Sequence, residues 1–308
     1  MVVGLIQQRK ILEIETMKYL NNNRFVTKMS FKNVPTICIG EKEHLLIRTI
    51  DCFHGHLQKE DDMLSSLEWE SINPCSGPIY VMGAEKGDIL KVYIHEITID
   101  NHGIILMDKM DLDKYGIRTR EKSLHVNIDK QRIEISEDCL IDVEPMIGVI
   151  GTAPLKDEVF TTLPGIHGGN MDSKCIKKGS IVYLPVFHPG GLMVLGDLHA
   201  TMADGEAVGS GVETSGNVEI SVEILKKSNI PLPLVEVDDK IITIASAETL
   251  EEAANESVRM MFQYLIEQIK IQNDMAWKLV SMLADVHICQ FANKLKTVRC
   301  ELPRKCIK

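Results

Sequence analysis

Asp197 and His199 are two residues whose types and spacing could bind a metal ion. They follow an apolar segment, Leu192–Leu195, that is typical of a buried β-strand. Residues two apart on a strand point to the same face, so a carboxylate and an imidazole would lie together, as in zinc and iron sites. A turn of small residues with Asp204, Gly205 and Glu206 then leads to a further carboxylate, Glu213. A polar turn between two strands is the alternative interpretation.

A second candidate lies in the glycine-rich loop from Leu163 to Asp172, where glycines flank His167. Their small size would leave the imidazole accessible and would let a small ligand approach the backbone. Asn170 and Asp172 add an amide and a carboxylate to the same loop. A glycine-rich loop is weak evidence by itself, but these three polar residues together indicate a binding site.

Asp51 is a third candidate. It ends the apolar run Leu45–Ile50 and comes shortly before His54 and His56. A carboxylate at a strand end beside two imidazoles could belong to a metal site. A surface turn is the alternative.

The elements that must position these side chains are mostly β-strands. Alternating or continuous apolar runs recur along the chain, for example at Ile89–Ile97, Ile181–Phe187 and Val218–Leu225. We expect residues 101–142 to be irregular with short strands. Because no regular helices separate the strands, a doubly wound parallel sheet is not expected.

Two helices are expected late in the chain. Thr249 and Glu252 have the spacing of a capping box, and an apolar stripe continues from there to about Ile269. Asn273 could begin a second helix that reaches Leu283.

The composition limits the kind of protein. The chain has 308 residues, of which 44% are hydrophobic and 25% charged, a balance typical of globular proteins. Its net charge of −10 argues against binding to nucleic-acid phosphates. No apolar run reaches the roughly 18 residues that a membrane span needs. None of the eight cysteines forms a Cys-x-x-Cys pair, so we expect reduced thiols in a cytoplasmic protein.

Several blocks of sequence occur in a recognisable order: Ser76-Gly77-Pro78, Gly83-Ala84-Glu85, Pro164–Asp172, Leu195–Ala200 and Gly205–Thr214. Together they resemble the acetamidase/formamidase family of amide hydrolases, over about residues 24–303. The resemblance implies a mostly β (α+β) fold, a β-sandwich or barrel with a C-terminal helical pair. It places a catalytic domain at 24–308 after an N-terminal extension at 1–23. It also implies a small amide substrate such as formamide or acetamide, a divalent metal (zinc, with calcium possible), and a homodimer or larger homo-oligomer.

The resemblance and the candidate residues together predict the roles of individual side chains. The expected metal ligands are Asp51, His167, Asp197, His199 and Glu213. The expected catalytic residues are Glu213, Asp172 and Glu144, and the substrate would contact His167, Gly168, Gly169 and Asn170.

Other functions remain open at this point. The chain could hydrolyse another linear or cyclic C–N bond, or it could bind a metal or small ligand without catalysis. A Ser-Ser-Lys amidase would need a Gly-Gly-Ser-Ser-Gly-Gly-like run, which is absent. Cys175 lies between Lys174 and Lys178, which could lower its pKa and make it a nucleophile.

Overall fold

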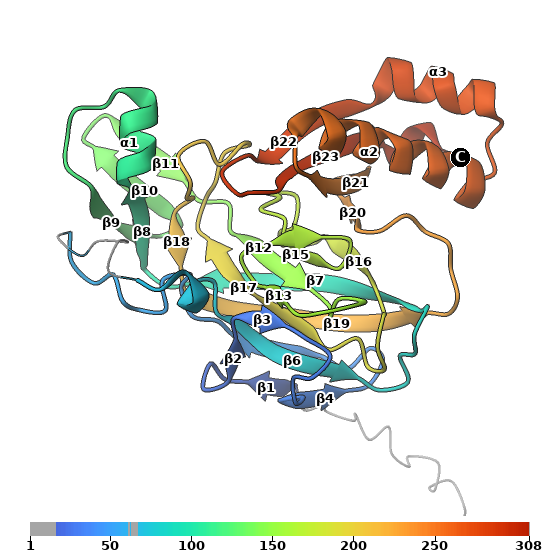
Figure 1. Ribbon diagram of the computed structural model, residues 1–308, viewed down its shortest axis with the longest axis horizontal. Helices are drawn as coiled ribbons and strands as arrows, with labels where there is room; N and C mark the ends of the chain where they lie inside the picture. The colour runs from blue at the N-terminus through green and yellow to red at the C-terminus, as the bar shows by residue number, and fades with distance from the viewer. Residues whose placement is uncertain (1–16, 61, 63–66, 308) are drawn as a thin grey trace, which may run out of the picture.

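Two β-sheets packed against each other form the body of the protein (Figure 1). The computed structural model describes residues 17–60, 62 and 67–307. Within these residues one sheet has nine strands and the other twelve, and a two-stranded ribbon lies beside them. The predicted mostly β fold with a C-terminal helical pair is confirmed.

The nine-stranded sheet contains, in spatial order, β1 Lys18–Leu20, β5 Leu45–Arg48, β19 Gly216–Leu225, β7 Ile89–Ile99, β16 Ile181–Pro185, β20 Leu234–Val237, β21 Lys240–Ala247, β23 Lys296–Pro303 and β22 Asp285–Gln290. The main path of the second sheet contains β11 Cys139–Asp142, β10 Arg132–Ser136, β9 Lys122–Asp129, β8 His102–Met107, β18 Glu213–Thr214, β17 Met193–His199, β12 Met146–Gly151, β15 Gly168–Asn170 and β14 Pro164–Gly165. Its remaining strands are β6 Cys75–Val81, which pairs with β17, and β2 Phe25–Val26 and β4 Ile37–Ile39, which pair with β6. The ribbon pairs β3 Lys28–Met29 with β13 Val159–Phe160.

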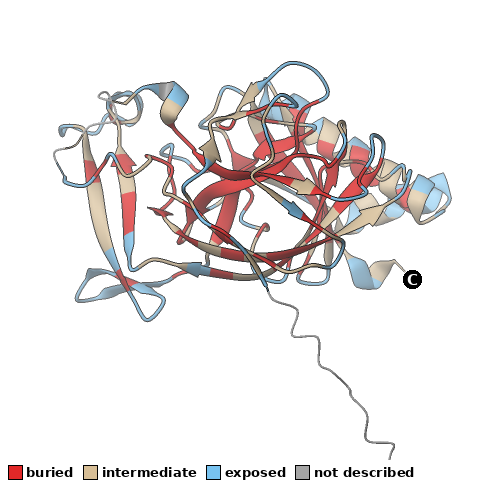
Figure 2. Ribbon diagram, turned by 90° about the horizontal axis from the view of Figure 1, so that it is seen from below, coloured by how far each residue is buried: buried red, intermediate tan, exposed pale blue. Residues whose placement is uncertain are grey.

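Strand β19 shows how the sequence builds the core. Val218, Ile220 and Val222 are fully buried, whereas Glu219 and Glu223 on the opposite face are partly exposed. The buried side chains join a cluster that also contains residues of β12 and β17 from the other sheet. The apolar faces of the two sheets therefore meet in one core, which is buried through the middle of the molecule (Figure 2).

Strand β17 has no solvent-facing side: all seven of its residues are buried. It lies inside its sheet, paired with β12, β18 and β6. A strand covered on both faces reads as a continuous apolar run, as Leu192–Leu195 does. Asp197 and His199, at the end of this run, are therefore carried into the interior.

The helical pair covers one part of the nine-stranded sheet. Thr249 caps α2 Leu250–Gln263 through the predicted capping box with Glu252. A short π-helical segment, η3 Tyr264–Gln268, continues α2, and α3 Asn273–Leu283 follows. Met261, Leu265 and Ala276 pack with apolar residues of β21 and β23.

Two regions differ from the sequence expectations. Residues 101–142 contain a helix, α1 Lys109–Tyr115, capped by Asp108 and ended by Gly116 at a φ of 69°. Leu112 is its one buried residue, so helical periodicity could not reveal it. Residues 18–20 of the expected extension form β1, which pairs in parallel with β5. Residues 1–16 of this extension lie outside the described residues.

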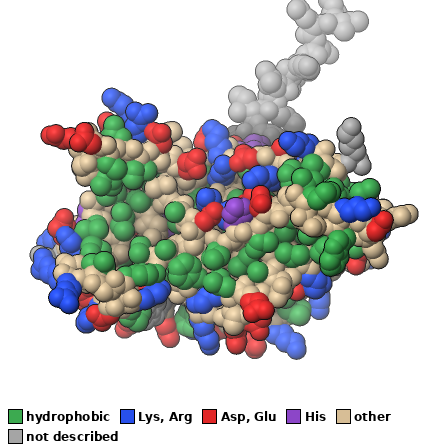
Figure 3. Space-filling view, turned by 90° about the horizontal axis from the view of Figure 1, so that it is seen from above, with side chains coloured by type: hydrophobic (Ala, Val, Ile, Leu, Met, Phe, Trp, Pro, Cys, Tyr) green, Lys and Arg blue, Asp and Glu red, His purple; other side chains and the backbone are tan. Residues whose placement is uncertain are grey.

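Two observations concern binding to membranes and to other large partners. In the part of the chain that is described, no helix is both long enough and apolar enough to cross a membrane. On the face shown in Figure 3, basic side chains are interspersed with acidic and hydrophobic ones.

The short 3₁₀ segments η2 Trp69–Ser71 and η4 Arg304–Cys306 complete the fold.

Candidate functional site

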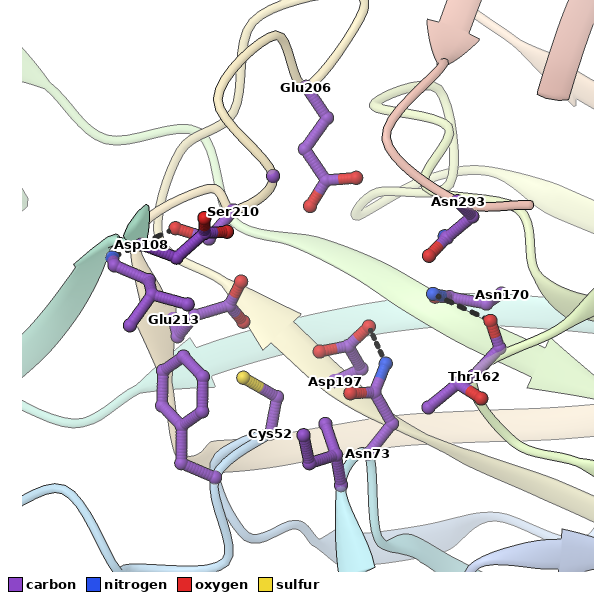
Figure 4. A pocket seen from close by; sticks show the side chains of 14 residues that line it. Cys52, Asn73, Asp108, Thr162, Asn170, Asp197, Glu206, Ser210, Glu213 and Asn293 are labelled. Carbon is purple, nitrogen blue, oxygen red and sulfur yellow. Dashed lines mark hydrogen bonds between the residues drawn. The ribbon is translucent and has the colours of Figure 1, made fainter. Parts of the chain in front are cut away.

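A cavity of about 90 Å³ lies beside β17 and β18 (Figure 4). Segments far apart in sequence line it: the turn after β5, the residues before β6, the end of β15 and the loop between β17 and β18. Its polar lining consists of Cys52, Asn73, Asp108, Thr162, Asn170, Asp197, Glu206, Ser210, Glu213 and Asn293. Since water occupies ~30 Å³ per molecule in the liquid, the cavity has room for a molecule of only a few non-hydrogen atoms.

Strands β17 and β18 bring three of the predicted site residues together. His199 and Glu213 lie directly opposite each other in this antiparallel pair. Glu213 Oε2 lies 3.1 Å from His199 Nε2, and Asp197 Oδ1 lies 3.7 Å from the same nitrogen. Two carboxylates thus flank one imidazole, and Asp197 and His199 are adjacent as their spacing predicted.

Asp172 and Glu206 approach His199 from two different loops. One ligand atom from each of the three residues lies within 4.8 Å of the others. Asp172 was a predicted catalytic residue, whereas the sequence assigned no role to Glu206. A second pair of carboxylates therefore lies close to the imidazole.

Backbone conformation is unusual at four of the site residues. Asn73, Asp172, Asp197 and Glu206 have φ values of 54°, 45°, 57° and 44°. This left-handed region is uncommon for residues other than glycine, although Asn and Asp tolerate it best. Such conformations persist where the surrounding structure enforces them, and they concentrate at functional sites.

The site concentrates negative charge away from solvent. Asp172, Asp197, Glu206 and Glu213 are between 1% and 7% exposed, and His199 is 1% exposed. Among the described residues, none of the four carboxylates forms an ion pair with a lysine or arginine. Buried charges without a partner are unfavourable, so this group calls for a cation or for protons.

The pKa values of the buried site residues are shifted in a way that reflects the same excess of negative charge. Burial raises the pKa of Asp172 well above its usual range, and the carboxylates of Glu206 and Asp197 raise it further. Burial also raises the pKa of Glu213, and that of Glu206 to about 8. For His199, burial alone would lower the pKa, but Glu213 and Asp197 raise it well above the usual value.

Several polar atoms in the site have no hydrogen-bond partner although they are buried. They are both carboxylate oxygens of Asp172, Oε2 of Glu213, Nδ1 of His199 and Oδ1 of Asn170. Buried polar atoms in proteins are nearly always satisfied, so a cluster of unsatisfied ones marks a place where bound water, an ion or a ligand would complete the hydrogen bonding.

Gly148 on β12 makes room for two of the carboxylates. A Cβ atom at this position would lie 2.6 Å from Asp197 Oδ2 and 2.7 Å from Asp172 Oδ1. Any side chain larger than hydrogen would collide with both. This explains one of the two glycines in the apolar run from 146 to 151.

An ion-pair network anchors the segments that carry Glu206 and Asp172. Arg299, which is 2% exposed, donates to both oxygens of Asp204 at 2.6 and 2.9 Å. Lys174 lies 3.0 Å from the same carboxylate. Because Asp204 is two residues from Glu206 and Lys174 two from Asp172, the network ties both loops to β23.

Asp51 and Glu144 are not in the cavity, which corrects two of the sequence assignments. Both carboxylate oxygens of Asp51 accept backbone N–H groups, from Phe53 at 3.0 Å and from Gly55 at 3.1 Å. Asp51 therefore stabilises the turn, and its neighbour Cys52 faces the cavity instead. Glu144 is exposed, in the connection between β11 and β12.

The glycine-rich loop is close to the site, but His167 itself belongs to neither group of ligand atoms. Its ring is buried between Gly165 and Gly169, where an added Cβ would lie 3.0 Å from a ring nitrogen. Burial lowers the pKa of His167 to about 4, so its imidazole is neutral. Gly168 and Gly169, with φ values of 91° and 86°, shape the β14–β15 hairpin, and Asn170 lines the cavity.

Sequence reasoning missed Cys52, Asn73 and Glu206. The sequence pattern assigned no role to Cys52 or Asn73. Glu206 lay inside a stretch already singled out, so its acidic type was the one available signal. Nothing in the local pattern shows that Asn73 reaches Asp197, which lies 124 positions away.

Comparisons with known proteins agree with this fold. The model of the Acetamidase/Formamidase family matches residues 14–159 and 151–249. The crystal structure of an acetamidase from Bacillus halodurans has a TM-score of 0.89 and is 36% identical, covering 92% of this chain and 96% of that one. A predicted acetamidase/formamidase from Thermoanaerobacter tengcongensis also has a TM-score of 0.89, with 37% identity over 94% of this chain and 97% of that one.

Curated relatives match over shorter stretches. A formamidase from Methylophilus methylotrophus is 43% identical over 67 residues, 21% of this chain and 16% of that protein. Across the curated relatives compared, the matches span 16% to 61% of their lengths. The family model and the two solved structures nevertheless cover most of the chain, which belongs to the acetamidase/formamidase family.

Proposed function

We propose that the protein is a metal-dependent amidohydrolase that cleaves short aliphatic amides, such as formamide and acetamide, to a carboxylate and ammonia. One observation supports the metal dependence: four buried carboxylates lie around His199 without a lysine or arginine partner among the described residues. Family membership supports the amide substrate.

The residues present fit a divalent cation. The unsatisfied oxygens of Asp172 and Glu213 and the unsatisfied nitrogen of His199 are the donor types that zinc binds. Calcium prefers oxygen donors alone, so an imidazole in the group favours zinc. When bound, such a cation would activate water for attack and polarise the amide carbonyl.

Asp197 and His199 are the residues that we assign to holding the metal. A catalytic zinc keeps one coordination position open and has three protein ligands. Asp197 and His199 supply two of these ligands, and we assign Glu213 to proton transfer, although it lies close enough to His199 to be a further ligand. Its Oε2 accepts no well-aligned hydrogen bond and lines the cavity, so it can take a proton from the attacking water.

Amide hydrolysis also needs a proton for the departing nitrogen and a means of holding the substrate. Asp172 is fully buried next to His199, and both of its oxygens are free to exchange a proton. Asn170 lines the cavity with Oδ1 unsatisfied, while its amide nitrogen donates to the Thr162 carbonyl at 3.4 Å. Asn170 Oδ1 can accept a hydrogen bond from an N–H group of a primary amide.

The size of the cavity favours a small substrate. At about 90 Å³ it can enclose a molecule of the size of formamide or acetamide. A Cys175 nucleophile has no support from this geometry, because Cys175 is absent from the cavity lining and burial raises its pKa to about 12.

The test is ammonia release from formamide and acetamide by protein loaded with zinc. We expect turnover that a chelator abolishes and added zinc restores. Turnover that survives complete removal of metal would overturn the metal assignment. If folded, zinc-loaded protein releases no ammonia from either amide, the proposed substrate class is wrong.

A further inference from the structure

Cys52 occupies the place in the cavity that the sequence assigned to Asp51. Its sulfur points toward Asp197 and Glu213 (Figure 4). One ligand atom from each of the three residues lies within 4.8 Å of the others, and all three residues are buried. The carboxylates in this group are the two that flank His199.

The backbone holds the thiol in this position from both sides. Asp51 fixes the turn that follows Cys52 by accepting the N–H groups of Phe53 and Gly55. The carbonyl oxygen of Cys52 accepts the backbone N–H of Asn73 at 2.8 Å. The sulfur is thus aimed into the cavity by a rigid turn.

A buried cysteine can also be simple apolar filling. Cys52 does pack against Phe53, Leu57, Ile104 and Leu106. Among the described cysteines, however, Cys52 is the one that joins a group of potential metal ligands. Cys75, equally buried, instead donates its S–H to the Asn73 carbonyl at 3.4 Å.

An unsatisfied atom beside the thiol provides independent evidence of a ligand. Glu213 Oε2 is buried without a hydrogen-bond partner, and Glu213 belongs to the same group of potential ligands as Cys52. Two carboxylates and a sulfur form a donor set for a borderline-soft cation.

We propose that Cys52 is a thiolate ligand of the metal and shares it with Asp197, which belongs to the same group of potential ligands. This inference rests on the proposed metal-dependent function. On binding, the sulfur–metal bond replaces the S–H bond, and the proton leaves to solvent. The thiolate makes the site select zinc or cobalt over calcium and magnesium.

Cobalt is the probe, because Co²⁺ takes zinc sites and a thiolate ligand adds a sulfur-to-cobalt charge-transfer band in the near ultraviolet. Chelator-stripped full-length protein is titrated to an equimolar amount of Co²⁺, and the spectra of wild type, Cys52→Ser and Cys75→Ser are compared. Circular dichroism and thermal melting establish that each variant is folded.

We expect the near-ultraviolet band in wild type and in Cys75→Ser, and its loss in Cys52→Ser. Visible cobalt bands without the near-ultraviolet band in wild type would overturn the inference and leave a metal site of carboxylates and histidine. The same holds if the band persists in Cys52→Ser. Absence of Co²⁺ and Zn²⁺ binding by folded wild type would overturn both this inference and the metal-dependent function. The wild-type spectrum decides the question even if Cys52→Ser does not fold.

Discussion

The side-chain amide of Asn73 donates a 2.9 Å hydrogen bond to Asp197 Oδ2, and both residues are buried. The other oxygen, Oδ1, faces His199 at 3.7 Å. The backbone N–H of Asn73 is bonded to the Cys52 carbonyl. One residue therefore sets the orientation of the Asp197 carboxylate and ties it to the turn that carries Cys52.

Replacing Asn73 with glycine should weaken metal binding without straining the backbone. Glycine accepts the φ of 54° found at this position, so the change removes mainly the amide. Loss of a partner that orients a ligand typically costs about 10- to 100-fold in metal affinity or activity, and we expect an effect of that size here. Competition with a chelator measures the affinity.

Asn33→Ala is the control, because the amide of Asn33 donates to the Lys28 carbonyl and does not line the cavity. Equal zinc affinity in wild type and Asn73→Gly would show that the hydrogen bond does not orient a metal ligand.

Gly148→Ala should disable the site by steric contact. The new methyl group would lie 2.6 Å from Asp197 Oδ2 and 2.7 Å from Asp172 Oδ1, so both carboxylates must move. A displacement of ~1 Å can lower kcat/KM by on the order of 100-fold, and we expect a loss of that order. Steady-state ammonia release measures it.

Gly40→Ala is the matched control. A Cβ at Gly40 would meet its nearest neighbours at 3.6 and 3.8 Å, which is ordinary contact. If Gly148→Ala retains wild-type kcat/KM and zinc content, the close packing of the two carboxylates is not needed for function.

Glu301 should stabilise the fold in a pH-dependent way. Burial alone would raise its pKa, but hydrogen bonds from Lys240 and Arg299 outweigh burial and lower the pKa to about 2. A lowered folded-state pKa contributes stability that is present above the unfolded value, ~4.3, and is lost as the pH falls through about 2. The contribution near pH 7 is on the order of 3 kcal/mol.

Thermal melting of wild type and Glu301→Gln measures this effect. The variant should melt at a lower temperature near pH 7, and the difference in Tm should shrink as the pH falls from about 5 toward 2. A difference that stays constant over this range would mean that the charge of Glu301 is not responsible. Glu252→Gln, on the exposed capping box, is a control whose carboxylate lies outside the network.

The positions of the strands could be predicted from sequence, because the pattern of apolar residues that marks each strand lies within that strand. The apolar run before Asp197 follows from its place inside a sheet, and the alternation in β19 follows from one buried and one wetter face. Thr249 and Glu252 specify the start of α2 through their own hydrogen bonds. Helix α1 escaped notice because a seven-residue helix with one buried residue has no period to detect.

The site could be predicted only in part, because it is assembled from distant segments. Asp197, His199 and Glu213 meet through neighbouring strands, and the spacing of the first two was informative. Between Asp51 and Cys52 the choice depended on which side chain turns inward, and a one-residue step reverses that direction. The role of Glu206 depends on the Arg299–Asp204 ion pair, which joins positions 95 residues apart.

The central claim is that a metal ion held by the buried carboxylates and His199 is required for amide hydrolysis. The most direct measurement determines bound zinc by elemental analysis, together with ammonia release, in wild type, His199→Ala and His188→Ala. His188 is a half-buried histidine that contacts the Pro154 carbonyl and does not line the cavity. We predict that folded His199→Ala loses both zinc and turnover, while His188→Ala keeps both. A folded His199→Ala protein that remains fully active without metal would contradict the account.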